Sequence, residues 1–380
     1  MIYFVPIILA IFFANRYDFR RQYQGRMLCY ALLCIILICI AGFRYRVGGD
    51  TIRYMESFKH YPDLSDFSKF DYRPDGLMPL SALFFSFCKT ISPSFYVLQF
   101  IHATIINVIF FSFIKKHTKF IFSTVLFYIV WSYLEFNTEI IKESLAICAI
   151  LLGIDNIPKK HFIRYYLFCI IALGFHISAI IAFIFPLFYK IKFNIVGLAI
   201  CLGSMVGFTA LYSILPDYFN ALNFITEDAE TLMQRYYEEE SSMGNISTWI
   251  LYLSQWIILP LLSLLIVSRG AYKTEFTFVG FILLGIILSY FTQYSFAFHR
   301  FLNYIVPFFW LLLANAMVSI STVKSFTFLK KQSILIILVF SLYATVSINL
   351  KFMIPGKEDV YKYFPYTSLF NEEKVYRPEW

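Results

Sequence analysis

Apolar runs recur from one end of the chain to the other, and no long polar region separates them. Of the 380 residues, 59% are hydrophobic and only 15% are charged, which is well below the share of about a quarter that is usual in soluble domains. The 45 Phe and 28 Tyr suit a bilayer, where aromatic rings fill the lipid phase and the headgroup belt. The sequence therefore predicts an all-α, polytopic membrane protein in which residues 1–380 form a single integral membrane domain.

The apolar runs predict about twelve transmembrane helices, several of them shorter than the usual length of about 20 residues. We place these helices at 1–14, 28–42, 94–114, 120–134, 138–156, 162–175, 177–189, 193–213, 247–267, 276–292, 301–320 and 332–350. The run 76–91 is also apolar enough to span, but it contains Pro79 and Lys89. We expect this run to lie along the outer surface of the membrane.

Lysine and arginine concentrate in six short loops, which is typical of loops that face the cytosol. These loops are 15–27, 115–119, 157–164, 190–192, 268–275 and 321–331. The net charge of +8 therefore indicates orientation, and no nucleic-acid partner is expected. Three long segments then face the outside, namely loops 43–92 and 215–247 and the C-terminal tail 351–380. The acidic residues of the second loop suit a solvated surface better than a metal site.

The segment 43–58, FRYRVGGDTIRYMESF, brings many polar residues to the end of an apolar run. If the segment is extended, Arg44 and Arg46 point the same way, and arginine forks bind phosphate oxygens. The Gly-Gly pair lets the backbone approach a ligand closely, and Tyr54 follows within the same segment. This combination suits a lipid-linked diphosphate substrate. The alternative is that the two arginines anchor the chain in the headgroups.

Asp50 follows the Gly-Gly pair and offers a carboxylate that can accept a proton. The same residue precedes Thr51 at a predicted helix start, so N-capping is the alternative. The two roles are compatible, because a capping carboxylate at a helix mouth still faces a site. Capping would, however, lower the proton affinity of Asp50 and weaken it as a general base.

A second polar cluster opens the fifth predicted span. Glu135, Glu139 and Glu143 are spaced four residues apart, which places them on one face of a helix, and Lys142 follows Glu139 by three residues. Carboxylates that enter a bilayer are costly unless they are paired or wet. The cluster predicts either a neutralising pair of Glu139 with Lys142 or a water-filled cavity whose acceptors hold sugar hydroxyls.

Two further candidate positions lie at outer membrane ends. His176 stands in the tight turn GFHIS between two short spans, and His299 and Arg300 precede the eleventh span. The alternative for both histidines is a packed or interfacial role. The predicted topology places all these candidates on one side of the membrane without requiring that they converge.

These motifs resemble the EpsG family of bacterial exopolysaccharide polymerases, which are Wzy-like. The resemblance rests on five short motifs in order along the chain: FRYRVGGDTIRY, RPDGL, GFHISAI, HRFLNYIVP and FPYTSLF. The family often has an Arg-Gln pair where this chain has Lys142 and Glu143. That difference bears on the role of position 142, because lysine is a point charge rather than a fork.

The resemblance implies a multi-pass glycosyltransferase of the bacterial inner membrane, similar in architecture to the C-type membrane glycosyltransferases, whose long first outer loop carries surface helices. At the outer face, towards the periplasm or cell exterior, the growing glycan would pass from undecaprenyl diphosphate to a lipid-linked repeat unit. The implied partners are the undecaprenyl-diphosphate-linked oligosaccharide and the lipid bilayer, with a flippase and chain-length regulators as candidates. No metal and no other cofactor is expected.

On this basis, the residues expected to be catalytic, as a base for the acceptor hydroxyl or as a hydrogen-bond acceptor that orients it, are Asp50, Glu139 and His176. The residues expected to bind substrate are Arg44, Arg46, Tyr54, Lys142, His299 and Arg300. Of these, the three arginines are expected to neutralise the leaving diphosphate. A lipid-linked oligosaccharide flippase or transporter remains an alternative, as does an O-antigen ligase or an acyltransferase-type enzyme that modifies glycans. A flippase should have polar residues through the depth of its spans, whereas here they gather at the outer ends.

Overall fold

The computed structural model describes residues 2–69, 78–214, 252–270, 276–292, 294, 297–320, 339 and 362–372. Within these residues the chain is helical, and its β-type pairings are isolated bridges that join Arg44 to Ser368 and Ser368 to Asn371. The predicted all-α class is therefore confirmed. The chain divides into two compact units, unit 1 (Met1–Ile180 and Asn349–Trp380) and unit 2 (Ile181–Ile348).

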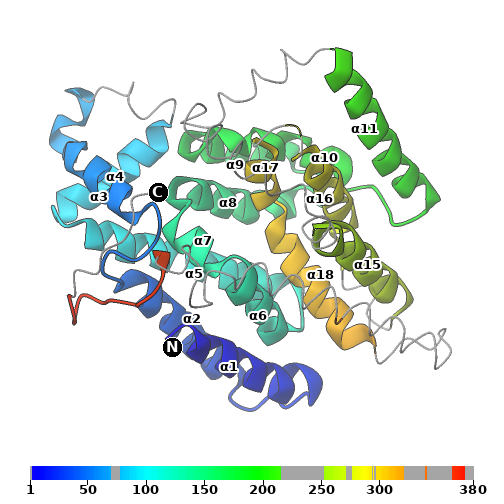
Figure 1. Ribbon diagram of the computed structural model, residues 1–380, viewed down its shortest axis with the longest axis horizontal. Helices are drawn as coiled ribbons and strands as arrows, with labels where there is room; N and C mark the ends of the chain where they lie inside the picture. The colour runs from blue at the N-terminus through cyan, green and yellow to red at the C-terminus, as the bar shows by residue number, and fades with distance from the viewer. Residues whose placement is uncertain are drawn as a thin grey trace. The chain divides into compact units, whose positions relative to one another are not determined.

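The helices of unit 1 run from blue to green in Figure 1. They are α1 (Phe4–Phe13), α2 (Arg26–Gly42), α3 (Thr51–His60), α4 (Pro79–Ile91), α5 (Phe95–His117), α6 (Ile121–Trp131), α7 (Tyr133–Thr138), α8 (Ile141–Gly153) and α9 (Phe162–Phe175). The helices of unit 2 are α10 (Phe185–Phe188), α11 (Ile195–Ile214), α15 (Leu259–Arg269), α16 (Val279–Phe291), α17 (Ala297–Asn303) and α18 (Val306–Ser319). Short stretches of tighter or wider helix add η1 (Ala14–Phe19), η2 (Leu64–Lys69), η4 (Ile154–Asn156), η5 (Ile177–Ile184) and η7 (Ser254–Ile258).

Helices occupy each predicted span that the described residues reach. The loop 215–247, and the span 332–350 apart from residue 339, lie outside the described residues. Among the described helices, α5 and α11 are long and apolar enough to cross a membrane. The predicted count of twelve spans is therefore not confirmed and stays a prediction.

In unit 1, α5 packs against α2 and α8, and α8 pairs with α9. Polar side chains inside this bundle bond to one another, since a buried polar group without a partner costs free energy. Asn107 donates from Nδ2 to Asn137 Oδ1 over 2.9 Å, and the Tyr128 hydroxyl donates to Asn107 Oδ1 over 2.8 Å. This ring of contacts ties α5, α6 and α7 together.

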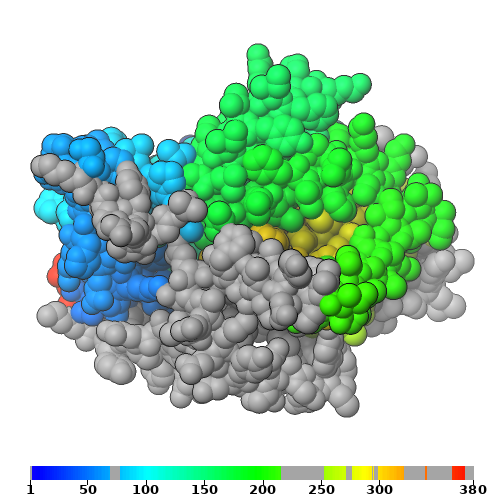
Figure 2. All heavy atoms as spheres, turned by 90° about the horizontal axis from the view of Figure 1, so that it is seen from above, coloured from blue at the N-terminus to red at the C-terminus, as the bar shows by residue number. Residues whose placement is uncertain are grey.

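The predicted loop 43–92 contains α3 and α4, which pack through an aromatic cluster. Phe85 of α4 contacts Phe58 and Tyr61, with ring centroids 6.5 and 4.9 Å apart. Lys89 donates from Nζ to the carbonyl of Lys59 over 2.7 Å, which helps to close the C-terminal end of α3. Figure 2 shows the blue atoms of α3 beside the light-blue atoms of α4.

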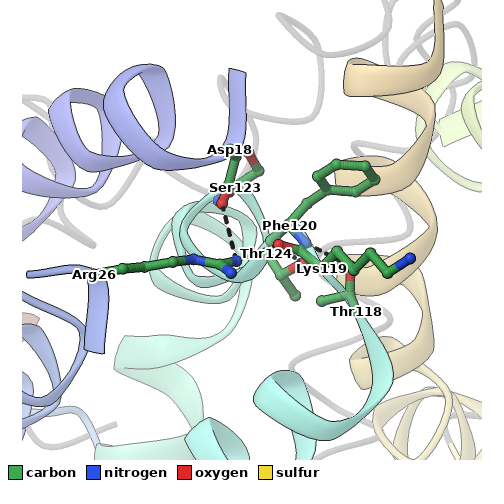
Figure 3. A network of polar contacts seen from close by, with 7 residues as sticks. All are labelled: Asp18, Arg26, Thr118, Lys119, Phe120, Ser123 and Thr124. Atoms are coloured by element: carbon green, nitrogen blue, oxygen red, sulfur yellow. Dashed lines mark hydrogen bonds and ion pairs between the residues drawn. The ribbon is translucent and has the colours of Figure 1, made fainter. Parts of the chain in front are cut away.

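A network of polar contacts in unit 1 lies at the start of α6 (Figure 3). The carboxylate of Asp18 accepts the backbone N–H of Ser123 over 2.7 Å, and Arg26 Nη2 lies 3.7 Å from Asp18 Oδ1. Arg26 also donates to the carbonyl of Lys119. Burial raises the pKa of Asp18 to about 6, although the Ser123 N–H and the Arg26 charge oppose that rise. The network joins η1 and the first residue of α2 to the start of α6.

Unit 2 is built on α15 and α16, which contact α18, with α11 and α17 also packed against α16. Phe281 and Phe308 lie in its core, with ring centroids 4.8 Å apart. Near the ends of α11 and α16, the Thr209 hydroxyl lies 2.8 Å from the hydroxyl of Tyr290. The helix α11 exposes much of its apolar surface, for example Val206 and Ile214.

Candidate functional site

The loop 43–50 begins where α2 ends, and the last four carbonyls of α2 all have hydrogen-bond donors. A helix leaves its final four carbonyls without partners of its own. Here Cys39 accepts from Phe43 N–H (3.0 Å), Ile40 from the Tyr366 hydroxyl (3.0 Å), Ala41 from Arg44 Nη1 (2.6 Å) and Gly42 from Gln99 Nε2 (2.8 Å). The end of α2 is thus closed by its own loop, by α5 and by the C-terminal tail.

The Arg44 side chain bonds to carbonyl groups of the protein itself. Its side chain is 1% exposed, and Nε donates to the carbonyl of Val47 over 3.0 Å in addition to the bond that closes α2. Burial lowers the pKa of Arg44 to about 10, opposed by Tyr3, Tyr133 and Glu139, so the guanidinium remains charged at neutral pH. Of the three guanidinium nitrogens of Arg44, Nη2 has no hydrogen-bond partner within the described residues, whereas Nε and Nη1 each donate to a carbonyl. A substrate-binding role for Arg44 stays a prediction, and the geometry favours a structural one.

The extended backbone that would make Arg44 and Arg46 point the same way is not present at Arg46. Arg46 has a φ of 52°, which is the left-handed region, so the chain turns at this residue. The rule that side chains two residues apart point the same way holds only for extended backbone. Arg46 is half-buried whereas Arg44 is buried, and the argument that both forks reach one diphosphate loses its basis.

Glu139 lies at the break between two helices. Residue 138 is the last of α7, Ile140 has a φ of −110° and a ψ of 52°, and α8 begins at Ile141. The prediction that Glu135, Glu139 and Glu143 share one helical face is therefore wrong. The break instead turns the Glu139 carboxylate towards the loop 43–50.

The Glu139 carboxylate accepts four hydrogen bonds. The donors are the backbone N–H of Gly49 (2.7 Å), the backbone N–H of Asp50 (3.1 Å), the Tyr363 hydroxyl (2.8 Å) and the Thr138 hydroxyl (3.1 Å). Three of these bonds fall on Oε1 and one falls on Oε2. Because a carboxylate has about four acceptor positions, most of the capacity of Glu139 is used inside the protein.

The two glycines suit this turn for different reasons: Glu139 approaches Gly49, whereas Gly48 has a left-handed backbone. A Cβ on Gly49 would lie 2.7 Å from Glu139 Oε2, closer than real contacts allow. Gly48 has a φ of 115°, and a Cβ there would lie 2.5 Å from the hydroxyl of Thr51. The close approach that the sequence predicted towards a ligand is, in the structure, an approach to a protein carboxylate.

Asp50 occupies the N-cap position of α3, yet its side chain makes no capping hydrogen bond. Its backbone N–H is bound by Glu139 instead, and its side chain is half-buried. The Tyr54 hydroxyl donates to the carbonyl of Glu139 over 3.1 Å. The structure therefore gathers Asp50, Tyr54 and Glu139 at the start of α3, and the capping alternative for Asp50 is not what the structure contains.

The C-terminal tail is docked on the same loop. Gly48 N–H donates to Lys362 O over 2.8 Å, Tyr45 N–H donates to Thr367 O over 2.8 Å, and Leu369 N–H donates to Phe43 O over 3.0 Å. Gln99, Tyr363 and Thr367 also hold this loop, and none of them is predicted from the sequence. The available signal was the run of aromatic and small polar residues after the last predicted span.

His176 and Lys142 are both buried in unit 1. His176 ends α9, and its Nδ1 accepts the backbone N–H of Ser178 over 3.2 Å. The Ser81 hydroxyl of α4 donates to the carbonyl of Phe175, the neighbour of His176, over 2.7 Å. Lys142 lies in the first turn of α8.

His299 and Arg300 belong to α17 of unit 2, and both are half-buried. Burial lowers the pKa of His299 to about 4, so its imidazole is neutral at neutral pH. The substrate-binding roles of His299, Arg300 and Lys142 and the catalytic role of His176 stay predictions. Within the described residues, no group of three His, Cys, Asp or Glu side chains could hold a metal ion.

Neither a curated protein nor a solved structure matches this chain. The sequence model of the EpsG family matches residues 27–368. This range includes the loop 43–50, Glu139 and the tail as far as Ser368. Together with its apolar helices, the match shows that the chain belongs to the EpsG family of polysaccharide polymerase-like membrane proteins.

Proposed function

We propose that this protein is an exopolysaccharide polymerase that transfers a growing glycan from undecaprenyl diphosphate to a lipid-linked repeat unit. The observation that carries the proposal is the extent of the family match. It covers the loop 43–50, Glu139 and the tail, the three segments that hydrogen bonds join around Asp50. Membership of a polymerase-like family, together with this polar cluster, supports glycosyl transfer as the reaction.

The reaction exchanges one carbon–oxygen bond for another and transfers one proton. The acceptor hydroxyl oxygen bonds to the anomeric carbon of the donor sugar, the bond from that carbon to the diphosphate oxygen breaks, and the hydroxyl proton passes to a base. We assign the base to Asp50, because its half-buried carboxylate does not cap α3. Glu139 accepts four protein donors and is better suited to hold Asp50 in place.

The departing lipid diphosphate carries negative charge that cations stabilise. We assign Arg46 to this group, since its side chain is half-buried and a guanidinium fork fits phosphate oxygens. Arg44 adds a fixed positive charge beside it. His176 and Tyr54 are proposed to orient the acceptor, and Lys142, His299 and Arg300 to contact the substrate.

We place the reaction at the outer face of the inner membrane, in a multi-pass chain of about twelve spans, as single-domain C-type glycosyltransferases are built. The basic loops support this orientation. In a cysteine-free variant, a cysteine at Ser65 should react with an impermeant thiol reagent in intact spheroplasts, whereas one at Lys159 should not. Both positions are exposed, so accessibility of the side chain does not bias the comparison. The reverse labelling pattern would overturn the orientation.

The activity is tested with purified protein in vesicles that contain lipid-linked repeat units. We expect a ladder of longer lipid-linked glycans from the wild-type protein and none from Asp50→Asn. Movement of the substrate across the bilayer without elongation would identify a transporter instead. Transfer of the glycan only to an added acceptor other than the repeat unit would identify a ligase.

A further inference from the structure

We infer that Tyr363 is a positioning residue, which acts through Glu139 on the backbone that carries Asp50, and that residues 362 and 363 of the docked tail are part of the site. This inference rests on the proposed function, because it concerns the geometry of the proposed base. It assigns to the C-terminal tail a role in the reaction in addition to its contacts with α2.

Three successive backbone N–H groups lead into α3, and each is bound by the tail or by Glu139. Gly48 donates to the carbonyl of Lys362, while Gly49 and Asp50 donate to the Glu139 carboxylate. These bonds fix the backbone at the point where Asp50 begins the helix. The tail and Glu139 therefore act on one short stretch of chain.

Tyr363 links these two supports directly. Its ring is 4% exposed, and its hydroxyl donates to Glu139 Oε1 over 2.8 Å, next to the bond from Gly49 on the same oxygen. Burial and the nearby Glu139 carboxylate raise the pKa of Tyr363 well above its usual value, so the hydroxyl keeps its proton and remains a donor. Without this hydroxyl, Oε1 would lose one of its three donors, and the carboxylate would be held less firmly against the glycines.

The chain offers a matched control in Tyr366. This second tail tyrosine is half-buried and also donates a hydrogen bond, but its acceptor is the carbonyl of Ile40 at the end of α2. Tyr363→Phe and Tyr366→Phe each remove one hydroxyl from the same tail. A difference between them reports the specific link to Glu139 rather than general loosening of the tail.

The test combines hydrogen exchange with steady-state kinetics on the full-length protein in vesicles. Loss of a hydrogen bond to a charged group should speed amide exchange in peptides covering 47–50 about tenfold in Tyr363→Phe. The same variant should lower kcat for polymerisation about tenfold, while KM for the lipid-linked repeat unit stays near the wild-type value. Tyr366→Phe should leave exchange at 47–50 and kcat close to those of the wild type. Glu139→Gln should reproduce the exchange effect of Tyr363→Phe.

The exchange measurement separates this inference from the proposed function, because it needs no activity. Unchanged exchange at 47–50 in Tyr363→Phe would overturn the inference, whatever the kinetics show. A rise in exchange of equal size across α3, α4 and α5 would also overturn it, because that result reports general destabilisation. Faster exchange confined to 47–50, in a protein whose wild type makes no polymer, would retain the link through Glu139 and remove the polymerase proposal.

Discussion

Two carboxylates of unit 1, Asp18 and Glu139, each accept backbone N–H groups at the start of a helix, but in different surroundings. Asp18 accepts the N–H of Ser123 in the first turn of α6, 105 residues further along the chain. Glu139 accepts the N–H groups of Gly49 and Asp50 at the start of α3, 90 and 89 residues earlier. In both cases a negative charge from a distant segment lies at a helix N-terminus, where the helix dipole favours it.

The difference lies in exposure and in the neighbours. Asp18 is 2% exposed and stands beside Arg26, so its contacts are closed within the protein. Glu139 is half-buried, and its donors belong to a glycine turn, a half-buried aspartate and a tail tyrosine. We therefore expect the contact of Asp18 to stabilise the fold at α6 and the contact of Glu139 to shape the proposed site at α3. Changes near Glu139 should therefore alter activity, and changes near Asp18 should alter stability.

The largest effect is expected at Asp50, the residue that Glu139 positions. Asp50→Asn keeps the size of the side chain but removes its capacity to accept a proton, and general-base assistance is typically worth about 10²–10⁴-fold. Asp50→Ala should lose as much polymer formation as Asp50→Asn. Since the carboxylate makes no capping bond, neither variant removes a side-chain cap from α3. Polymer yield at matched membrane abundance measures this effect, and an active Asn variant would return the residue to a structural role.

The next effect is expected at Glu139 itself. Glu139→Gln leaves a single acceptor oxygen for donors that now use two, so one backbone N–H at Gly49 or Asp50 faces an amide group instead. Leaving a buried donor unsatisfied costs about 1–3 kcal/mol, and a loss of activity of about tenfold to a hundredfold should follow. Polymerisation kinetics and thermal unfolding in detergent check this result. If Glu139→Gln and Asp18→Asn reduce activity equally, the contrast between the two carboxylates is false.

The sequence predicts the elements of this site better than their arrangement. Apolar runs predict helices because the length and spacing of apolar residues along the chain follow from the helix itself. The predicted run 162–175 coincides with α9. The start of α3 after Asp50 also follows from local residues. These features depend on neighbours within a few positions.

The remaining features depend on contacts between distant segments. The left-handed turn at Arg46 is held by a tail more than 300 residues away. Arginine does not favour left-handed backbone, so its presence at position 46 does not predict this turn. The approach of Glu139 to Gly49 joins positions 90 residues apart. The even spacing of three glutamates suggested one helical face, but those tertiary contacts favour a break at 139–140.

A smaller effect on activity is expected at Arg46, whereas substitution of Arg44 should mainly affect stability. Arg46→Lys keeps a charge but loses the bidentate fork, and we expect about a tenfold loss of polymer formation, equivalent to about 1.4 kcal/mol. Arg44→Lys should instead lower the free energy of unfolding by about 1–3 kcal/mol, because lysine cannot serve both the Ala41 and Val47 carbonyls from the same geometry. Melting temperature and activity are measured for both variants. A stable, inactive Arg44→Lys protein would show that Arg44 acts on the substrate.

The smallest effect on activity is expected at Asp18. Burial raises the pKa of this carboxyl in the folded protein to about 6, whereas an unfolded aspartate titrates near 3.9. Between these values the folded state holds a proton that the unfolded state has lost, so stability from this group increases as the pH falls from about 7 to about 4. The gain is at most about 3 kcal/mol. Asp18→Asn keeps an oxygen that can accept the Ser123 N–H but does not titrate.

The difference in melting temperature between wild type and Asp18→Asn, measured at pH 7.5 and pH 5, isolates this group because all other groups titrate in both proteins. We expect the wild type to gain a few degrees relative to the variant on acidification. Polymer formation at pH 7.5 should stay within about twofold of the wild type. Equal pH dependence in the two proteins would show that the Asp18 carboxyl is not held at a raised pKa. A large loss of activity would show that the network at the start of α6 also supports the reaction.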